Sequence, residues 1–213
     1  MFPFSVAAAV SAAAVSACTI NAPARDAPAL YDFGPHASAT RSERRIPGTL
    51  LIAAVTAPAW LDTTGIVYRL NYEDSNRLRA YNESRWVATP AMLLTEALRM
   101  RFAGPAEQVV SAADGAQADR VLRVDLEDYT QAFDAPTRSR VAIRARATLV
   151  DRRSRAVVAQ QTFAATRDAE PNAAGAADAL AECAGEVVEN VLDWVAQKLK
   201  NSAAASTAER SSR

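Results

Sequence analysis

The fold is decided by two stretches, Val121-Leu122-Arg123-Val124-Asp125-Leu126-Glu127 and Arg140-Val141-Ala142-Ile143-Arg144-Ala145-Arg146-Ala147-Thr148-Leu149. In both of them apolar residues alternate with charged residues, and this period of two is typical of a β-strand with one face buried and one face in water. If the two strands pair antiparallel, Asp125 and Glu127 face the arginines of the second strand across the wet side of the sheet. These charges therefore compensate one another without a ligand.

A third strand and a long helix are predicted after these two strands. The turn Asp151-Arg152-Arg153-Ser154 leads into a strand over about 156–166, which completes a three-strand meander. Apolar residues then recur at the i, i+3, i+4, i+7 spacing of an amphipathic helix: Leu180, Cys183, Ala184, Val187, Val188, Val191, Leu192, Val195 and Leu199. We expect this helix on the dry face of the sheet, so that Cys183 within its stripe is a buried and inert thiol.

Shorter elements are predicted upstream. An edge strand is expected at 29–33, a buried strand at 49–56, and a hairpin of 66–72 with 77–81. Thr89-Pro90 places a capping residue before a proline at the first helical position, which predicts a helix over 90–103, followed by a short strand over 107–111. The predicted fold class is therefore α/β of the α+β type, with one domain. It has an antiparallel or mixed sheet with a hairpin, a three-strand meander and two main helices packed on one face.

The amino-terminal segment has the composition of a signal peptide. Residues 2–17 carry no charge, are mostly small or apolar, and end in Val15-Ser16-Ala17 before Cys18. A helix of this length reaches roughly 24 Å, less than the ~30 Å hydrocarbon core of a bilayer, so residues 1–17 are predicted to be a signal peptide. Small residues before a cysteine resemble the bacterial lipobox, in which the thiol receives a diacylglycerol. An ordinary signal peptide cleaved after an Ala-x-Ala-like site is the alternative.

Under the lipobox interpretation, Cys18 begins the mature chain and residues 18–28 form a lipidated, Pro/Ala-rich tether. Thr19 rather than Asp follows the cysteine, which is similar to lipoproteins that are sorted to the outer membrane. The folded domain then covers residues 29–200 and faces the periplasm. The Ser/Ala-rich residues 201–213 are predicted to be a disordered tail.

Composition and motifs exclude several classes of function. The 213 residues include 24 basic and 24 acidic side chains, so the chain lacks the positive charge that nucleic-acid binding requires. With one histidine and two cysteines, it cannot build a His/Cys zinc site or a disulfide framework. His36 would need distant partners to act as a base, and alternation sends Asp128 to the face opposite Asp125 and Glu127. Because phosphate-binding and hydrolase motifs are also missing, we expect no catalytic site, metal or cofactor.

Aromatic side chains with polar tips are concentrated in one part of the chain: Trp60, Tyr68, Tyr72, Tyr81 and Trp86. Alternation places Tyr68 and Tyr72 on one face of a strand, with Tyr81 on its hairpin mate. Such residues are favoured where one end of a side chain is dry and the other is wet, as in protein interfaces. Two interpretations stay open. Either these residues form a surface that faces a partner, or they cover the part of the core that the hairpin contributes.

The same segments resemble the ABC-type transport auxiliary lipoprotein family, which includes the paraquat-inducible protein C lipoproteins. The resemblance covers residues 28–200 loosely. It runs through Leu30-Tyr31-Asp32-Phe33-Gly34-Pro35, Ala59-Trp60-Leu61-Asp62, Ile66-Val67-Tyr68-Arg69, Tyr81, Arg85-Trp86-Val87-Ala88-Thr89-Pro90 and Met92-Leu93-Leu94-Thr95-Glu96-Ala97-Leu98. No single motif is diagnostic, but the ordered set behind a lipobox is specific.

The resemblance implies a non-enzymatic outer-membrane lipoprotein that works beside an ABC-type transporter. Its partners would be an inner-membrane protein with MCE domains, an ABC permease and an ATPase, and the cargo would be lipids or other hydrophobic molecules. The positions that match the family's aromatic pattern, Tyr68, Tyr81 and Trp86, mark either the fold or a docking surface. The alternative function is a periplasmic lipoprotein that holds a lipid or small ligand in its own pocket. A homo-oligomer would leave the same composition.

Overall fold

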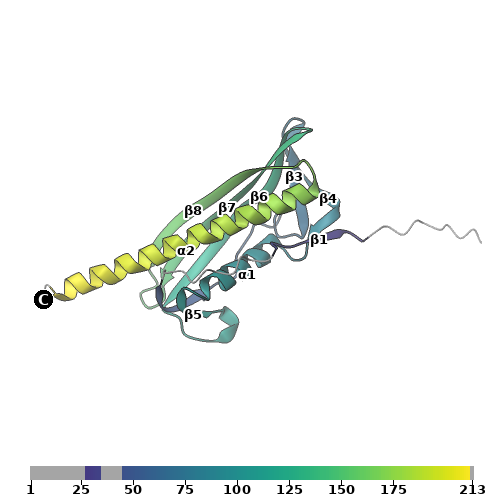
Figure 1. Ribbon diagram of the computed structural model, residues 1–213. Coiled ribbons are helices and arrows are strands. Elements are labelled where there is room, and N and C mark those ends of the chain that lie inside the picture. The colour runs from purple at the N-terminus through teal and green to yellow at the C-terminus, as the bar shows by residue number, and fades with distance from the viewer. Residues whose placement is uncertain (1–26, 35–44, 212–213) are drawn as a thin grey trace, which may run out of the picture.

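The computed structural model describes residues 27–34 and 45–211, with side chains as far as Asn201. A long twisted sheet forms the body of the molecule, and the helices lie along one side of it (Figure 1). Its strands are β1 (Ala29–Tyr31), β2 (Ile46–Ile52), β3 (Gly65–Leu70), β4 (Asp74–Trp86), β5 (Ala106–Val110), β6 (Arg120–Ala135), β7 (Arg138–Asp151) and β8 (Val157–Ala169). The helices are α1 (Pro90–Phe102), the 3₁₀ helix η1 (Ala112–Asp114) and α2 (Ala173–Ser211).

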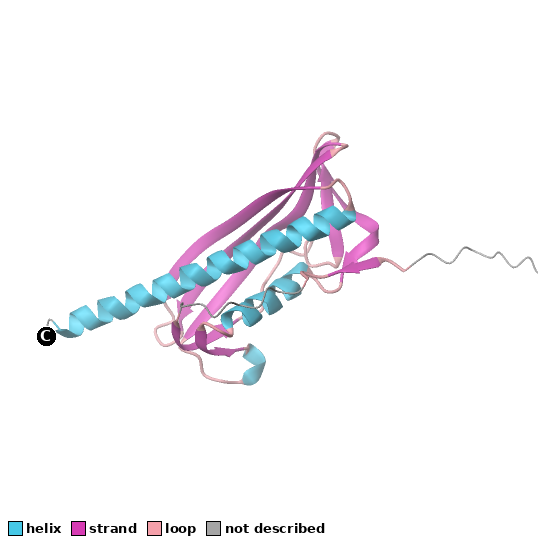
Figure 2. Cartoon of the chain, in the orientation of Figure 1, coloured by secondary structure: helices cyan, strands magenta, loops and turns pink. Residues whose placement is uncertain are grey.

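The long strand β6 organises the sheet. β6, β7 and β8 form the antiparallel meander that the sequence predicts. Along its other edge, β6 pairs in parallel with β2 near its start and with β3 near its end. β5 adds to β2 in parallel, β4 forms the hairpin with β3, and β1 adds to β4 in parallel. The sheet is therefore mixed, and the predicted α+β class with a hairpin, a meander and two main helices is confirmed (Figure 2).

The outer face of the meander carries the predicted charge pairs. Arg146 Nη2 lies 2.9 Å from Glu127 Oε1, and Arg146 Nε lies 3.9 Å from Asp125 Oδ2. The prediction for Asp128 is wrong, because a β-bulge at Glu127 shifts the register, so that Asp125 pairs with Arg146 and Asp128 pairs with Arg144. Asp125 and Asp128 therefore share the outer face.

Helix α2 covers the inner face of β7 and β8, as the apolar stripe predicts (Figure 1). Cys183 is fully buried in this stripe, and burial raises the pKa of its thiol although Arg167 lies beside it. Helix α1 packs against α2. Arg101 of α1 joins the two helices through both carboxylate oxygens of Glu189, with Nη2 at 2.8 Å from Oε2.

Several elements are longer than alternation and periodicity predict. β4 continues to Trp86 and β6 continues to Ala135, beyond the predicted ends at 81 and 127. α2 begins at Ala173, well before the apolar stripe, because its first turns are mostly alanine, which has the highest helix propensity but adds little to a stripe. At its other end, helical backbone extends to Ser211, over residues for which the sequence predicts a disordered tail.

Candidate functional site

Trp86 lies in the core and not on a surface. It is 1% exposed, and its ring meets Phe33 edge-on with 5.8 Å between centroids. The ring of Tyr129 lies 5.6 Å from that of Trp86 on another side. Tyr129 is itself buried, and the loss of solvation raises the pKa of its hydroxyl well above the usual value. This cluster fastens the segment after β1 to β4 and β6, so Trp86 serves the fold.

Tyr68 and Tyr81 form a half-buried pair on the inner face of the hairpin. Their ring centroids are 4.7 Å apart, and Phe133 of β6 lies 5.7 Å from Tyr68. The Tyr81 hydroxyl donates a hydrogen bond of 2.7 Å to Gln131 Oε1. Burial, with a smaller contribution from Tyr68, raises the pKa of Tyr81 to about 12, so this hydroxyl is a neutral donor at physiological pH.

Gln131 stands at the centre of a buried hydrogen-bond network below this pair. Its Nε2 donates to Ser139 Oγ at 2.8 Å and to the carbonyl of Glu170 at 2.9 Å, and Ser139 Oγ donates to the carbonyl of Ala169. The network therefore joins β4, β6 and β7 to the segment that connects β8 with α2. Unbroken alternation from the start of β6 predicts that Gln131 faces outward, so the sequence pattern does not reveal its buried role. The pattern that could have predicted its burial is the spacing of two between Tyr129, Gln131 and Phe133, which places Gln131 on the same face as two aromatic residues.

We use the name hairpin surface for three exposed side chains of the β3–β4 hairpin and of the segment just before it: Trp60, Tyr72 and Leu78. Trp60 lies over the guanidinium of Arg69, whose Cζ is 5.9 Å from the ring centroid. Leu78 pairs with Arg69 across β3 and β4. Tyr72 lies in the turn after β3, and because this strand ends at Leu70, Tyr72 does not share a strand face with Tyr68. Aromatic residues and arginine are enriched in protein–protein interfaces, although this hairpin also exposes the charged residues Glu73, Asp74 and Arg77.

The structure therefore divides the five predicted aromatic residues into three groups. Trp86 belongs to the core, Tyr68 and Tyr81 form the half-buried pair, and Trp60 and Tyr72 are exposed on the hairpin surface. Packing in the core accounts for Trp86, and a role of Trp60 and Tyr72 in facing a partner stays a prediction.

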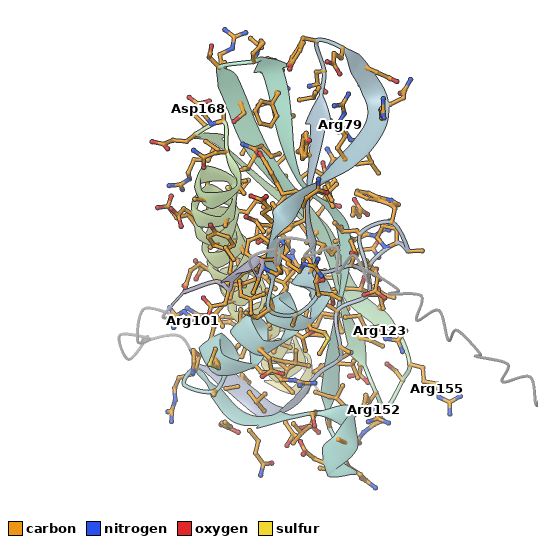
Figure 3. All side chains as sticks on the ribbon, turned by 90° about the vertical axis from the view of Figure 1, so that its right-hand side faces the viewer. Arg79, Arg101, Arg123, Arg152, Arg155 and Asp168 are labelled. Atoms are coloured by element: carbon orange, nitrogen blue, oxygen red, sulfur yellow. The ribbon has the colours of Figure 1, made fainter. Side chains whose placement is uncertain are left out.

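A basic turn lies at the opposite end of β6 from the hairpin. It connects β7 to β8 and contains Arg152, Arg153 and Arg155. Figure 3 shows Arg152 and Arg155 at the far end of the molecule from Arg79 of the hairpin. The Asp151 carboxylate pairs with Arg120 at 2.7 Å through Oδ2 and accepts the backbone N–H of Ser154 in the turn at 2.8 Å through Oδ1. The two ends of the sheet thus differ, because, among the described residues, the hairpin end carries the exposed aromatic residues and this end does not.

The residues expected to carry chemistry are not all described. Cys18 and His36 lie outside the described residues, so lipidation of Cys18 and the expectation that His36 has no catalytic role both stay predictions. Within the described ranges, no group of three or more His, Cys, Asp or Glu residues is arranged to hold a metal ion. In the same part of the chain, no helix combines the length and the apolar character needed to cross a membrane.

A family model matches most of the chain. Residues 31–192 match the model described as ABC-type transport auxiliary lipoprotein component. The match extends from the end of β1 into α2 and includes the hairpin surface and the Gln131 network. The sequence has no significant match among curated proteins.

Solved structures share the fold. Protein XCC0632 from Xanthomonas campestris has a TM-score of 0.73 at 18% sequence identity, over 82% of this chain and 98% of that one. A second structure, described as an uncharacterized protein, has a TM-score of 0.61 at 16% identity, over 80% of this chain and 99% of the other. At these identities the likeness shows the fold alone.

Proposed function

Since the chain belongs to the family of ABC-type transport auxiliary lipoprotein components, we propose that it is a non-catalytic docking component of an MCE-type transport system, anchored in the outer membrane. Cys18 carries the lipid anchor in this proposal, and the domain faces the periplasm. The inner-membrane partner is a protein with MCE domains, which works with an ABC permease and an ATPase. Together they move lipids or other hydrophobic molecules between the two membranes.

The hairpin surface is the observation that supports a docking role. Eight large apolar side chains are exposed in the described part of the chain, and three of them belong to the hairpin surface. Trp60 and Arg69, which contact each other, are also of the residue types that are enriched among the residues that dominate binding energy in protein interfaces. An exposed apolar group of this kind is unfavourable in water unless a partner covers it.

A lipid anchor would allow even a weak contact with a partner to be substantially occupied. Two or three acyl chains hold a protein at a membrane in an effectively stable way, whereas one chain does not. Eleven residue steps separate Cys18 from the first residue of β1, so the domain stays within about 40 Å of its anchor. This confinement raises the effective concentration of the hairpin surface near a partner that spans the periplasm.

A homo-oligomer is also part of the proposal, because β8 has no second partner strand among the described residues. Residues 159–166 of this edge strand, the segment that we propose to pair, contain no charge and no proline. Monomeric proteins commonly use charges and prolines to protect such an edge from pairing. Pairing with a second copy would satisfy the free backbone groups of β8.

Photo-crosslinking in intact cells tests the docking role. A photoreactive amino acid replaces Tyr72 on the hairpin surface, and Met100, an exposed residue of α1, is the matched control position. Capture of a protein with MCE domains from position 72 but not from position 100 is the expected result. Capture of phospholipid alone from position 72 would instead favour a domain that binds lipid itself. If neither position captures a protein with MCE domains, the docking proposal fails.

A further inference from the structure

We propose that one corner of the domain, formed by Leu30, Val87 and Met92, rests on the phospholipid surface of the membrane that holds the anchor. The proposal rests on the proposed function, because it assumes that Cys18 is acylated. It goes further by assigning a second membrane contact to the folded domain, which we term the anchor-side corner. This contact would fix how the domain is oriented above the bilayer.

The three residues lie in β1, directly after β4 and in the first turn of α1, and hydrogen bonds connect these segments. The backbone N–H of Val87 donates to the carbonyl of Tyr31 in β1 at 2.8 Å, one residue after Leu30. Two residues beyond Val87, Thr89 caps α1, and its hydroxyl accepts from the backbone N–H of Met92 at 3.4 Å. Backbone hydrogen bonds and short chain segments thus keep these three residues in the same region of the domain.

All three side chains are largely exposed to solvent. Leu30 is 64% exposed, Val87 52% and Met92 60%. Of the eight large exposed apolar side chains in the described ranges, three belong to the hairpin surface and three to this corner. Isolated apolar residues on a surface need no explanation, but a group of them marks a contact with a partner or a membrane.

Because the anchor-side corner is close in sequence to Cys18, the membrane is the partner that we propose for it. Leu30 lies only twelve residues after Cys18, so a fully extended connection of about 40 Å is the greatest separation between the corner and an anchored residue 18. The hairpin turn lies at the other end of β4, whose 13 residues span up to about 40 Å. Under the proposed anchor, the corner therefore contains the exposed apolar side chain that is closest along the chain to residue 18.

The charges around the corner indicate an apolar mode of contact. The exposed charged side chains on the same three elements include Asp32, Arg85 and Glu96, which have both signs. A contact that depended on anionic headgroups would require a net positive patch. Leucine, valine and methionine instead partition into the boundary between headgroups and acyl chains, about 5–10 Å deep.

Fluorescence quenching by lipids with brominated acyl chains tests this inference on the full-length, lipidated protein. A fluorophore that responds to polarity is attached to a Val87→Cys variant and, as the control, to a Val157→Cys variant. Val157 is the same residue type, is 61% exposed, and begins β8 at the far end of the sheet. Cys183 is buried, and Cys18 is acylated in the proposal, so the introduced cysteine is the reactive thiol. The proteins are reconstituted into vesicles of phosphatidylethanolamine and phosphatidylglycerol.

The expected result is several-fold stronger quenching at position 87 than at position 157, with the emission at position 87 shifted to shorter wavelength. A label on a Met92→Cys variant should be quenched as strongly as the label at position 87. This agreement would show that the quenching is not caused by one label site. Equal quenching at positions 87 and 157, or none at either, with acylation of Cys18 confirmed by mass spectrometry, would overturn the corner contact and leave the proposed function standing. An unmodified Cys18 would overturn the anchor and the corner contact together.

The lipid composition separates the two modes of contact. Quenching at position 87 should persist when phosphatidylglycerol is omitted or the salt concentration is raised, because the contact is apolar. Loss of quenching under either condition would show that headgroup charge, and not the apolar corner, carries the contact.

Discussion

Replacing Tyr81 by phenylalanine should destabilise the domain by about 1–2 kcal/mol. The substitution removes the donor that lies 2.7 Å from Gln131 Oε1 and leaves this buried amide oxygen without a partner. An unpaired buried acceptor costs about 1–3 kcal/mol. The lower part of this range applies because Tyr81 is only half-buried and water can replace part of the lost bond. For a domain of this size the melting temperature should fall by about 2–8 °C.

The matched control is Tyr68→Phe. Tyr68 stacks on Tyr81 in the same hairpin, but its hydroxyl forms no hydrogen bond with another described residue. Urea denaturation of the three proteins, followed by circular dichroism, gives the free energies of unfolding. Equal losses in the Tyr81 and Tyr68 variants would refute the view that the Gln131 network stabilises the hairpin.

The Tyr81→Phe variant should also differ from the wild type in how its free energy of unfolding depends on alkaline pH. The pKa of Tyr81 is about 12 in the folded protein, above its ordinary value of 10.0. Between these two values the unfolded chain releases the phenolic proton and the folded chain keeps it, so the free energy of unfolding falls as pH rises through this window. Tyr81→Phe should therefore lose stability less steeply than the wild type between pH 10 and 12. Parallel curves would contradict the raised pKa.

Three further outcomes are expected. Thr95→Val should lower the free energy of unfolding, measured by urea denaturation, by about 1–3 kcal/mol. The reason is that the buried Thr95 hydroxyl accepts a hydrogen bond from the backbone N–H of Val55 at 2.9 Å. Thr95→Ser, which keeps the hydroxyl, should lower it less. Arg155→Gly should raise the free energy of unfolding by up to about 1 kcal/mol, since Arg155 has a φ of 58°, whereas Arg153→Gly in the same turn should not raise it. Cys183 should resist maleimide in the folded protein and react after unfolding in urea, because burial raises the pKa of its thiol; rapid labelling of the folded protein would contradict this.

The elements that the sequence predicts well are those whose local pattern agrees with their tertiary surroundings. The alternation in β6 and β7 and the stripe of α2 each follow from one buried face. The second half of β4 could not be predicted, because Asn82-Glu83-Ser84-Arg85 has little β propensity and becomes a strand through its pairing with β1 and β3. Tertiary pairing decides such segments, and a single sequence does not show it.

The candidate site shows the same limit. The sequence locates the aromatic residues between positions 60 and 86 but does not divide them between core and surface. That division depends on where β3 ends, which puts Tyr72 in a turn, and on the bulge at Glu127, which brings Gln131 under Tyr81. A shift of one residue exchanges the two faces of a strand, so an unrecognised bulge reverses every prediction made beyond it.

The two proposed contacts lie at the two ends of β4. Its first residue, Asp74, follows the turn of the hairpin surface, and its last residue, Trp86, precedes Val87 of the anchor-side corner. If the corner rests on the bilayer, the strand holds the hairpin surface at a fixed height of up to about 40 Å, which a tether alone would not do. The Gln131 network supports β4 between these ends through Tyr81. Tyr81→Phe should therefore weaken crosslinking from position 72 while quenching at position 87 is unchanged, and an equal loss of both would show that the two contacts are not separate.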